Sequence, residues 1–274
     1  MNSSPDKQSQ NRPPPNRHID ATFRLNKLIT EYGLCSRRRA DEWIFEGKVA
    51  VDGVVCREPW HPVNPARQRV MIHGKPLRHP PPKLYVALYK PAGTLSTRTD
   101  PYKREKVVDL LPKKFKKAGV YPVGRLDGDS EGLILLSNDG EWTHHVIHPR
   151  HVVWKEYQVE VQRSLQNTEL RQLASGIELD GQKTLPANVW PTTEDPKVFH
   201  IEIREGRNRQ IRRMCSALGL KVKRLVRLRI GDIHLGGLEA GQWRYLEDWE
   251  ASSILAGCKN PPPKPSHQDP KAAS

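Results

Sequence analysis

The chain has few cysteines and no long apolar run, and both absences narrow its class. Four cysteines stand among 274 residues, Cys35, Cys56, Cys215 and Cys258, and none forms a Cys-x-x-Cys pair. This scatter favours a reducing compartment over a disulfide framework or a cysteine metal site. No apolar stretch approaches the ~20 residues that cross a bilayer. No basic amphipathic helix with an apolar face is apparent either, so we expect no membrane partner.

The ends of the chain have few apolar residues. Residues 1–18 are polar and contain prolines, without the apolar segment of a secretory signal, so we expect a cytoplasmic protein. Residues 1–22 and 257–274 are rich in Pro, Ser, Lys and Gln and are predicted to be disordered tails. The hydrophobic fraction of 36% is low but sufficient for a core between them.

Charge of one sign is in excess. Lys and Arg number 45 against 31 Asp and Glu, giving a net charge of +14 and an isoelectric point near 9.7. Such a balance indicates a polyanionic partner, and nucleic acid is the leading candidate. Four histidines also gather at positions 144, 145, 148 and 151. Because no cysteine lies nearby, solvated or RNA-facing histidines are favoured over a metal site.

The first folded unit is expected at residues 23–78. Leu25, Leu28 and Ile29 recur at helical spacing, and Gly33 closes that helix. Ser36 is predicted to cap a second helix. Two short hairpins follow, with turns at 52–53 and 73–74.

The first turn of the second helix carries Arg37, Arg38 and Arg39. Three cations there oppose the helix dipole, which suggests that they bind an anion such as phosphate. The unit resembles the S4 RNA-binding module. The alternative is a small capping domain with a solvated arginine face.

A proline-rich linker at 79–83 precedes a strand-rich region at 84–256. Strands are expected at 84–89, 133–136, 156–161, 199–203 and 226–230, and helices at 167–175 and 210–218. Strands outnumber helices without alternating with them, so we predict an α+β fold with a mixed, largely antiparallel sheet.

Three motifs in this region carry candidate chemistry. Asp127 follows Gly124-Arg125-Leu126 in a turn just before the apolar run 133–136, which reads as a strand buried on both faces. By itself this loop is ordinary, since aspartates often bond turn backbone. Tyr157 shares one strand face with Val159 and Val161, where a tyrosine is usually part of the core.

The third motif is the basic run 205–215, which opens a helix. On that helix Arg209 and Arg213 are expected opposite the apolar stripe, either solvated or holding phosphates. Arg212 is expected on the flank of the stripe, where it can reach a partly buried carboxylate.

The Gly-Arg-Leu-Asp motif, the Lys-x-Tyr of 155–157 and the run 206–214 resemble the active-site motifs of pseudouridine synthases. With the S4-like module, they resemble the RsuA-type ribosomal RNA branch over about Arg24 to Trp249. The amino-acid sequence of the third motif resembles that of the family member that acts on large-subunit (23S) ribosomal RNA and can also modify a transfer RNA.

The resemblance implies roles for individual residues. Asp127 would be the essential nucleophile or base, Tyr157 would contact the target nucleotide, and Arg212 would pair with Asp127. Arg125 would help hold the nucleotide flipped out of its stack, and the other basic residues would bind RNA. The remaining basic candidates are Lys113, Lys114, Lys116 and Lys117.

The implied reaction breaks the C1′–N1 bond of uridine, turns the base and rejoins it through C5, without a redox step or cofactor. Asp127 either attacks the base covalently or removes the C2′ proton to give a glycal. We also expect a monomer. Two further hypotheses are a non-catalytic RNA-binding or ribosome-assembly factor and an aspartate-based hydrolase. The hydrolase lacks a second paired acid near Asp127 apart from Asp129, and it lacks a phosphate-binding glycine loop.

Overall fold

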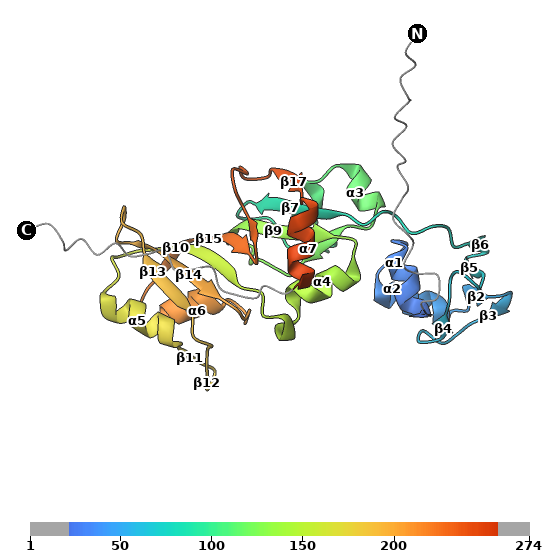
Figure 1. Cartoon of the computed structure of the whole chain (residues 1–274), viewed down its shortest axis with the longest axis horizontal. Helices are drawn as coiled ribbons and strands as arrows, with labels where there is room; N and C mark the ends of the chain where they lie inside the picture. The colour runs from blue at the N-terminus through green and yellow to red at the C-terminus, as the bar shows by residue number, and fades with distance from the viewer. Residues whose placement is uncertain (1–21, 257–274) are drawn as a thin grey trace, which may run out of the picture. The chain divides into compact units, whose positions relative to one another are not determined.

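The computed structural model describes residues 22–256. The tails expected at 1–22 and 257–274 therefore lie outside the described residues, apart from Thr22. The chain divides after Pro80 into two compact units, which are described separately here (Figure 1). Within the described residues, no helix is long and apolar enough to cross a membrane.

Over residues 22–80, the first unit contains two helices and six short strands. Its elements are β1 (Phe23–Arg24), α1 (Leu25–Glu31), α2 (Arg37–Phe45), β2 (Val49–Val51), β3 (Val54–Val55), β4 (Pro62–Val63), β5 (Val70–Ile72) and β6 (Lys75–Pro76). The strand order of its main sheet is β3-β2-β5-β6, and β1 pairs with β4. The Ser36 side chain accepts a hydrogen bond from Arg39 N and caps α2, as predicted.

The second unit holds a larger sheet with helices on both faces. Its elements are β7 (Tyr85–Lys90), η1 (Val107–Asp109), α3 (Lys113–Lys117), β8 (Tyr121–Val123), β9 (Glu131–Ser137), α4 (Gly140–Ile147), η2 (Pro149–His151), β10 (Lys155–Val161), α5 (Asn167–Ser175), β11 (Glu178–Leu179), β12 (Gln182–Lys183), β13 (Asn188–Pro191), β14 (Val198–Ile203), α6 (Gln210–Ala217), β15 (Val222–Ile230), β16 (Ile233–His234), β17 (Trp243–Tyr245) and α7 (Asp248–Ala256).

The nine-stranded sheet confirms the predicted α+β class. Its path is β13-β14-β10-β15-β9-β7-β17, with β16 beside β15 and β8 beside β9. Among the pairings of the described strands, β15 with β9 is parallel and the others are antiparallel. The five expected strands and the helices α5 and α6 are all present, with ends shifted by a few residues.

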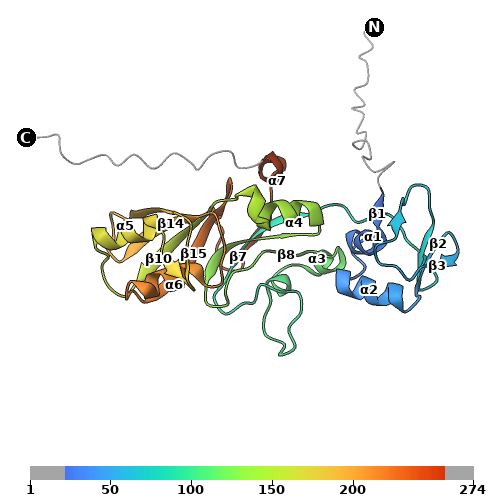
Figure 2. The ribbon, with the colours of Figure 1, turned by 90° about the horizontal axis from the view of Figure 1, so that it is seen from below.

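Strand β9 is buried on both faces, as its unbroken apolar run predicts. Leu133 and Leu135 pack in a cluster with α4 and α7, and Ile134 and Leu136 pack in one with α3 and α6. Figure 2 shows α4 and α7 on one side of the sheet and α3 and α6 on the other. The loop that precedes β9 is thus attached to a strand held rigidly from both sides.

Three helices of the second unit, α3, α4 and α7, were not predicted from the sequence. In α4, four histidines near its end obscure the spacing of Trp142 and Val146, which are the buried residues. Helix α3 spans only five residues. Helix α7 carries exposed Trp249 and Leu255 beside buried Ile254, so its apolar residues mark no clear stripe.

Gly132 lies where the parallel strands come closest. It has φ +99° and is paired with Arg227, and a Cβ built on it would lie 2.3 Å from the carbonyl oxygen of Arg227. Both the backbone conformation and the contact therefore require glycine.

We expect Gly132→Ala to lower the free energy of unfolding by several kcal/mol, on the order of 3, because backbone atoms on both strands must move apart. Denaturant unfolding measures the change. Gly237→Ala is the matched control, since no atom lies within 4 Å of its added Cβ. Equal stabilities of the two variants would contradict the close approach.

Candidate active site

Asp127 lies in the loop between β8 and β9, and side chains of Lys90 and Ser96 donate hydrogen bonds to the backbone of that loop. The Lys90 ammonium is fully buried and donates to the carbonyls of Ser130 at 2.7 Å and Gly128 at 3.3 Å. Burial lowers the pKa of Lys90 to about 8, against the opposing effect of nearby carboxylates led by Asp129. The Ser96 hydroxyl donates to the Leu126 carbonyl at 2.9 Å. These bonds fix the loop that carries Asp127.

A pocket of about 310 Å³ opens beside this loop and joins the three sequence motifs. It is lined by Arg125, Leu126, Asp127, Ser130, Tyr157, Ile203, Gly206, Arg207, Asn208, Arg209, Gln210, Ile211 and Leu225. The pocket therefore has apolar walls, one tyrosine, one carboxylate and three arginines. Such a lining suits a planar base attached to an anionic backbone.

Two arginines of the third motif bind Asp129, two residues after Asp127. Arg209 makes two hydrogen bonds to Asp129, at 2.8 and 3.1 Å, and its guanidinium lies 3.9 Å from Asp127. Arg212 donates to the backbone carbonyl of Asp129 at 2.9 Å and lies 3.4 Å from its carboxylate. Hydrogen bonding from Arg209, with the charge of Arg212, lowers the pKa of Asp129 despite partial burial.

The predicted pairing of Arg212 with Asp127 is therefore wrong in this structure. Arg212 lies on the flank of α6, as expected, but it meets the loop two residues beyond Asp127. Arg209 was expected to point outward, whereas it caps α6 with φ +48° and turns toward the loop. Arg213 forms an ion pair with Asp180 and does not line the pocket.

Tyr157 is 8% exposed and lines the pocket, where it contacts an arginine that the sequence reading did not single out. Arg227 is buried in β15 with its guanidinium 5.9 Å from the Tyr157 ring, and it donates to the Tyr157 hydroxyl at 3.4 Å. Its Nε donates to the carbonyl of Leu133 at 2.7 Å. Arg227 lies within the strand expected at 226–230, and this position was the sequence signal for its role. A cation that is buried in a strand needs hydrogen-bond partners such as these.

Three buried polar atoms at or beside the pocket have no hydrogen-bond partner among the described residues: Ser130 Oγ, Arg227 Nη2 and Arg212 Nε. Ser130 lines the pocket. Because a buried polar group without a partner is costly, the Ser130 hydroxyl is a site where a substrate atom can bind.

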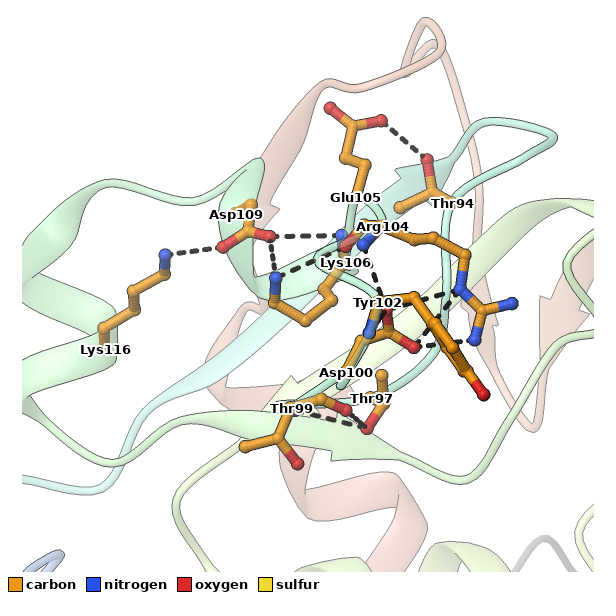
Figure 3. A network of polar contacts seen from close by, with 10 residues as sticks. All are labelled: Thr94, Thr97, Thr99, Asp100, Tyr102, Arg104, Glu105, Lys106, Asp109 and Lys116. Atoms are coloured by element: carbon orange, nitrogen blue, oxygen red, sulfur yellow. Dashed lines mark hydrogen bonds and ion pairs between the residues drawn. The ribbon is translucent and has the colours of Figure 1, made fainter.

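The segment from 91 to 106 packs against the loop of Asp127 and extends into solvent. Gly93 N donates to the Gly128 carbonyl at 2.7 Å. Farther out, Asp100 accepts hydrogen bonds from Arg104 and from the backbone N–H of Tyr102 (Figure 3). The Arg104 guanidinium lies 5.2 Å from the ring of Tyr102, which is 77% exposed. A carboxylate thus organises a turn that presents an aromatic ring and a cation.

The predicted RNA-binding arginines of α2 lie in the first unit. Arg37, Arg38 and Arg39 are exposed in its first turn, and Arg39 forms an ion pair with Glu42. In the second unit, the rings of the four clustered histidines have centroids 4.3 to 6.3 Å apart. Between residues 22 and 256, no group of three or more His, Cys, Asp or Glu side chains is placed to hold a metal ion.

Comparison with known proteins gives two matches to family models. Residues 84–217 match RNA pseudouridylate synthase, and residues 23–67 match the S4 domain. The chain is 38% identical over 237 residues to ribosomal large subunit pseudouridine synthase B of Bacillus subtilis, covering 85% of this chain and 96% of the relative. It is 36% identical over 243 residues to the dual-specificity RNA pseudouridine synthase RluF of Escherichia coli, covering 88% of this chain and 81% of the relative.

A solved structure is also similar to this chain. It is described as a pseudouridylate synthase, has 29% sequence identity and a TM-score of 0.62, and the match covers 85% of this chain and 99% of that one.

The Asp100 turn has a defined pH dependence. The side chain and backbone of Arg104 donate to Asp100 and lower its pKa to about 2, whereas an unfolded aspartate titrates near ~3.9. A lowered folded-state pKa means that the carboxylate stabilises the turn above about pH 4 and that this contribution is lost as the pH falls toward about 2. We expect Asp100→Asn to be less stable than the wild type near neutrality, with the difference vanishing at low pH.

Denaturant unfolding of both proteins at a series of pH values measures this difference. Asp232→Asn serves as the control, because Asp232 is exposed and lies outside the turn. A difference that stays constant down to about pH 2 would contradict the ionised Asp100 turn.

Proposed function

Since the chain belongs to the RNA pseudouridine synthases, we propose that it isomerises a specific uridine of large-subunit ribosomal RNA, with Asp127 as the essential nucleophile or base. The observation that carries the proposal is the pocket in which Asp127, Tyr157 and Arg209 meet from three separate segments. The substrate is inferred from the relative in B. subtilis, whose name specifies the large ribosomal subunit.

The reaction is an isomerisation that needs no electron acceptor. The C1′–N1 bond breaks, the base turns within the pocket, C5 bonds to C1′, and the C5 hydrogen leaves as a proton while N1 gains one. The Asp127 carboxylate acts at the start, either by attacking the base or by removing the C2′ proton. Its side chain is 28% exposed, so a bound nucleotide can reach it.

Tyr157 and Arg125 are assigned to the nucleotide. The Tyr157 hydroxyl lies beside the base, where it contacts the turning ring and takes part in proton transfer, and Arg227 orients it. Arg125 lines the same pocket and holds the nucleotide outside its stack. Removing a base from its stack costs a few kcal/mol, about 2 to 4, which contacts to phosphate supply.

Arg212 is a positioning residue in this proposal. It holds the backbone and carboxylate of Asp129, and Arg209 holds the same carboxylate and lies near Asp127. Arg37, Arg38 and Arg39 of the first unit, with Arg213, are assigned to RNA phosphates. We further propose that the enzyme works in the cytoplasm as a monomer. A transfer RNA is a second candidate substrate, because the relative RluF is a dual-specificity enzyme.

We expect Asp127→Asn to fold and to bind RNA but to lose turnover by at least about 10³-fold, because the amide is neither a nucleophile nor a base. Release of the C5 hydrogen from labelled uridine measures turnover on transcripts of the large-subunit, small-subunit and transfer RNAs. Asp232→Asn, which changes an exposed aspartate, is the control.

Release by the wild type and by Asp232→Asn, from large-subunit RNA, is the expected result. Full activity of Asp127→Asn would remove its assigned role. RNA binding by the wild type without release from any transcript would favour a non-catalytic RNA-binding factor.

A further inference from the structure

The first unit contains a hollow of about 520 Å³, larger than the pocket at Asp127. It is lined by Tyr32, Leu34, Trp43, Ile72, His73, Lys75, Pro76, Leu77, Arg78 and His79. The arginines 37 to 39, to which phosphate binding was assigned, are not part of this lining. The hollow is therefore a separate surface of the unit, and we call it the aromatic hollow.

Aromatic rings form part of its wall. Trp43, in α2, is only partly buried, and its ring meets that of His73 edge to face at a centroid distance of 4.8 Å. Tyr32, at the end of α1, is also partly exposed. Both rings are thus partly exposed to solvent in the same lining as Leu34, which is 50% exposed.

Two cations, Lys75 and Arg78, line the hollow together with the apolar side chains of Ile72, Pro76 and Leu77. Lys75 and Arg78 are exposed, and among the described residues no acidic side chain forms an ion pair with either of them. Many other arginines of this chain have such a partner, as Arg39 has Glu42. Unpaired cations beside aromatic rings attract an anion that also carries a flat apolar surface.

An unpaired nucleotide has both properties. Single-stranded RNA is bound by stacking bases on aromatic side chains while lysine and arginine hold the phosphates. An amphipathic helix of a partner protein would call for an apolar groove, whereas here four basic residues, His73, Lys75, Arg78 and His79, share the lining. The charge therefore favours RNA as the occupant.

We propose that the aromatic hollow binds one unpaired nucleotide of the substrate RNA, outside the active-site pocket. The base stacks on Trp43 and Tyr32, and the adjoining phosphate binds Lys75 and Arg78. The inference rests on the proposed function for the identity of the partner. It gives the first unit a site that distinguishes single-stranded from paired RNA, because a paired base does not present its face.

The first test uses the full-length wild-type chain, so no variant has to fold. Hexauridylate carrying 5-iodouridine is bound and irradiated, and the cross-linked peptides are identified by mass spectrometry. We expect cross-links at Tyr32, Trp43 or His73, suppressed by excess unmodified hexauridylate. Cross-links confined to the second unit would overturn the proposal.

Affinity provides the second test. We expect Trp43→Leu, which keeps apolar bulk, to weaken hexauridylate binding at the cross-linked site about tenfold, the loss of one stacked base. An abasic oligomer of the same length should bind it as it binds the wild type. Trp60→Leu is the matched control, since Trp60 is 61% exposed in the same unit and lies outside the hollow.

Arg78→Gln replaces an exposed side chain and tests the phosphate contact. It should weaken binding of both oligomers and reduce the slope of log affinity against log salt by about 0.7. Wild-type affinity for hexauridylate in both Trp43→Leu and Arg78→Gln would overturn the hollow. If the wild type still forms pseudouridine, the proposed function stands; absence of pseudouridine formation would overturn that function, and the cross-link would still report on the hollow.

Discussion

The candidate active site is held together by the ion pairs of the Asp129 carboxylate with Arg209 and Arg212. Arg209 binds it through two hydrogen bonds and Arg212 lies 3.4 Å away, so helix α6 is joined to a loop 80 residues earlier in the chain. The Asp129 side chain is 48% exposed, and exposed ion pairs add little stability, about 0 to 1 kcal/mol. The Asp129 pairing matters instead for geometry. It brings the third motif against Asp127, so that the two segments line one pocket. Precise placement of reacting groups accounts for a large part of enzymatic rate enhancement.

Residues of the sheet core support the loop that carries Asp127. The loop enters β9, a strand fully buried between two layers of helices, and Lys90 bonds its carbonyls from within the core. Arg227 crosses from the parallel neighbour strand to the Leu133 carbonyl and to the Tyr157 hydroxyl. One buried guanidinium therefore links the strand that follows Asp127 with the tyrosine across the pocket. These bonds position the pocket residues in the absence of a substrate, which is the arrangement expected of a preorganised site.

The sequence carried the local features that have a fixed period or a fixed turn chemistry. The run 133–136, the alternation around Tyr157 and the Ser36 cap each predicted their elements. The α+β class followed from expected strands that outnumber the helices without alternating with them. The partners of Arg209 and Arg212 could not be read in the same way. Helical spacing places a side chain on a face, but Arg209 itself precedes α6 in a left-handed conformation. The choice between Asp127 and Asp129 depends on how two distant segments meet. Lys90 and Arg227 were missed for a related reason, since each is a cation in a strand whose burial is set by the whole sheet.

A double-mutant cycle on Asp129→Asn and Arg209→Gln tests this account most directly. The rate constant kcat for pseudouridine formation is measured for the wild type, both single variants and the double variant. If the pairing positions Asp127, each single change lowers kcat, and the double variant is no slower than the slower single variant, because both changes remove the same contact. Losses that multiply in the double variant would show that the two side chains act independently, and would contradict the central role of the Asp129 pairing.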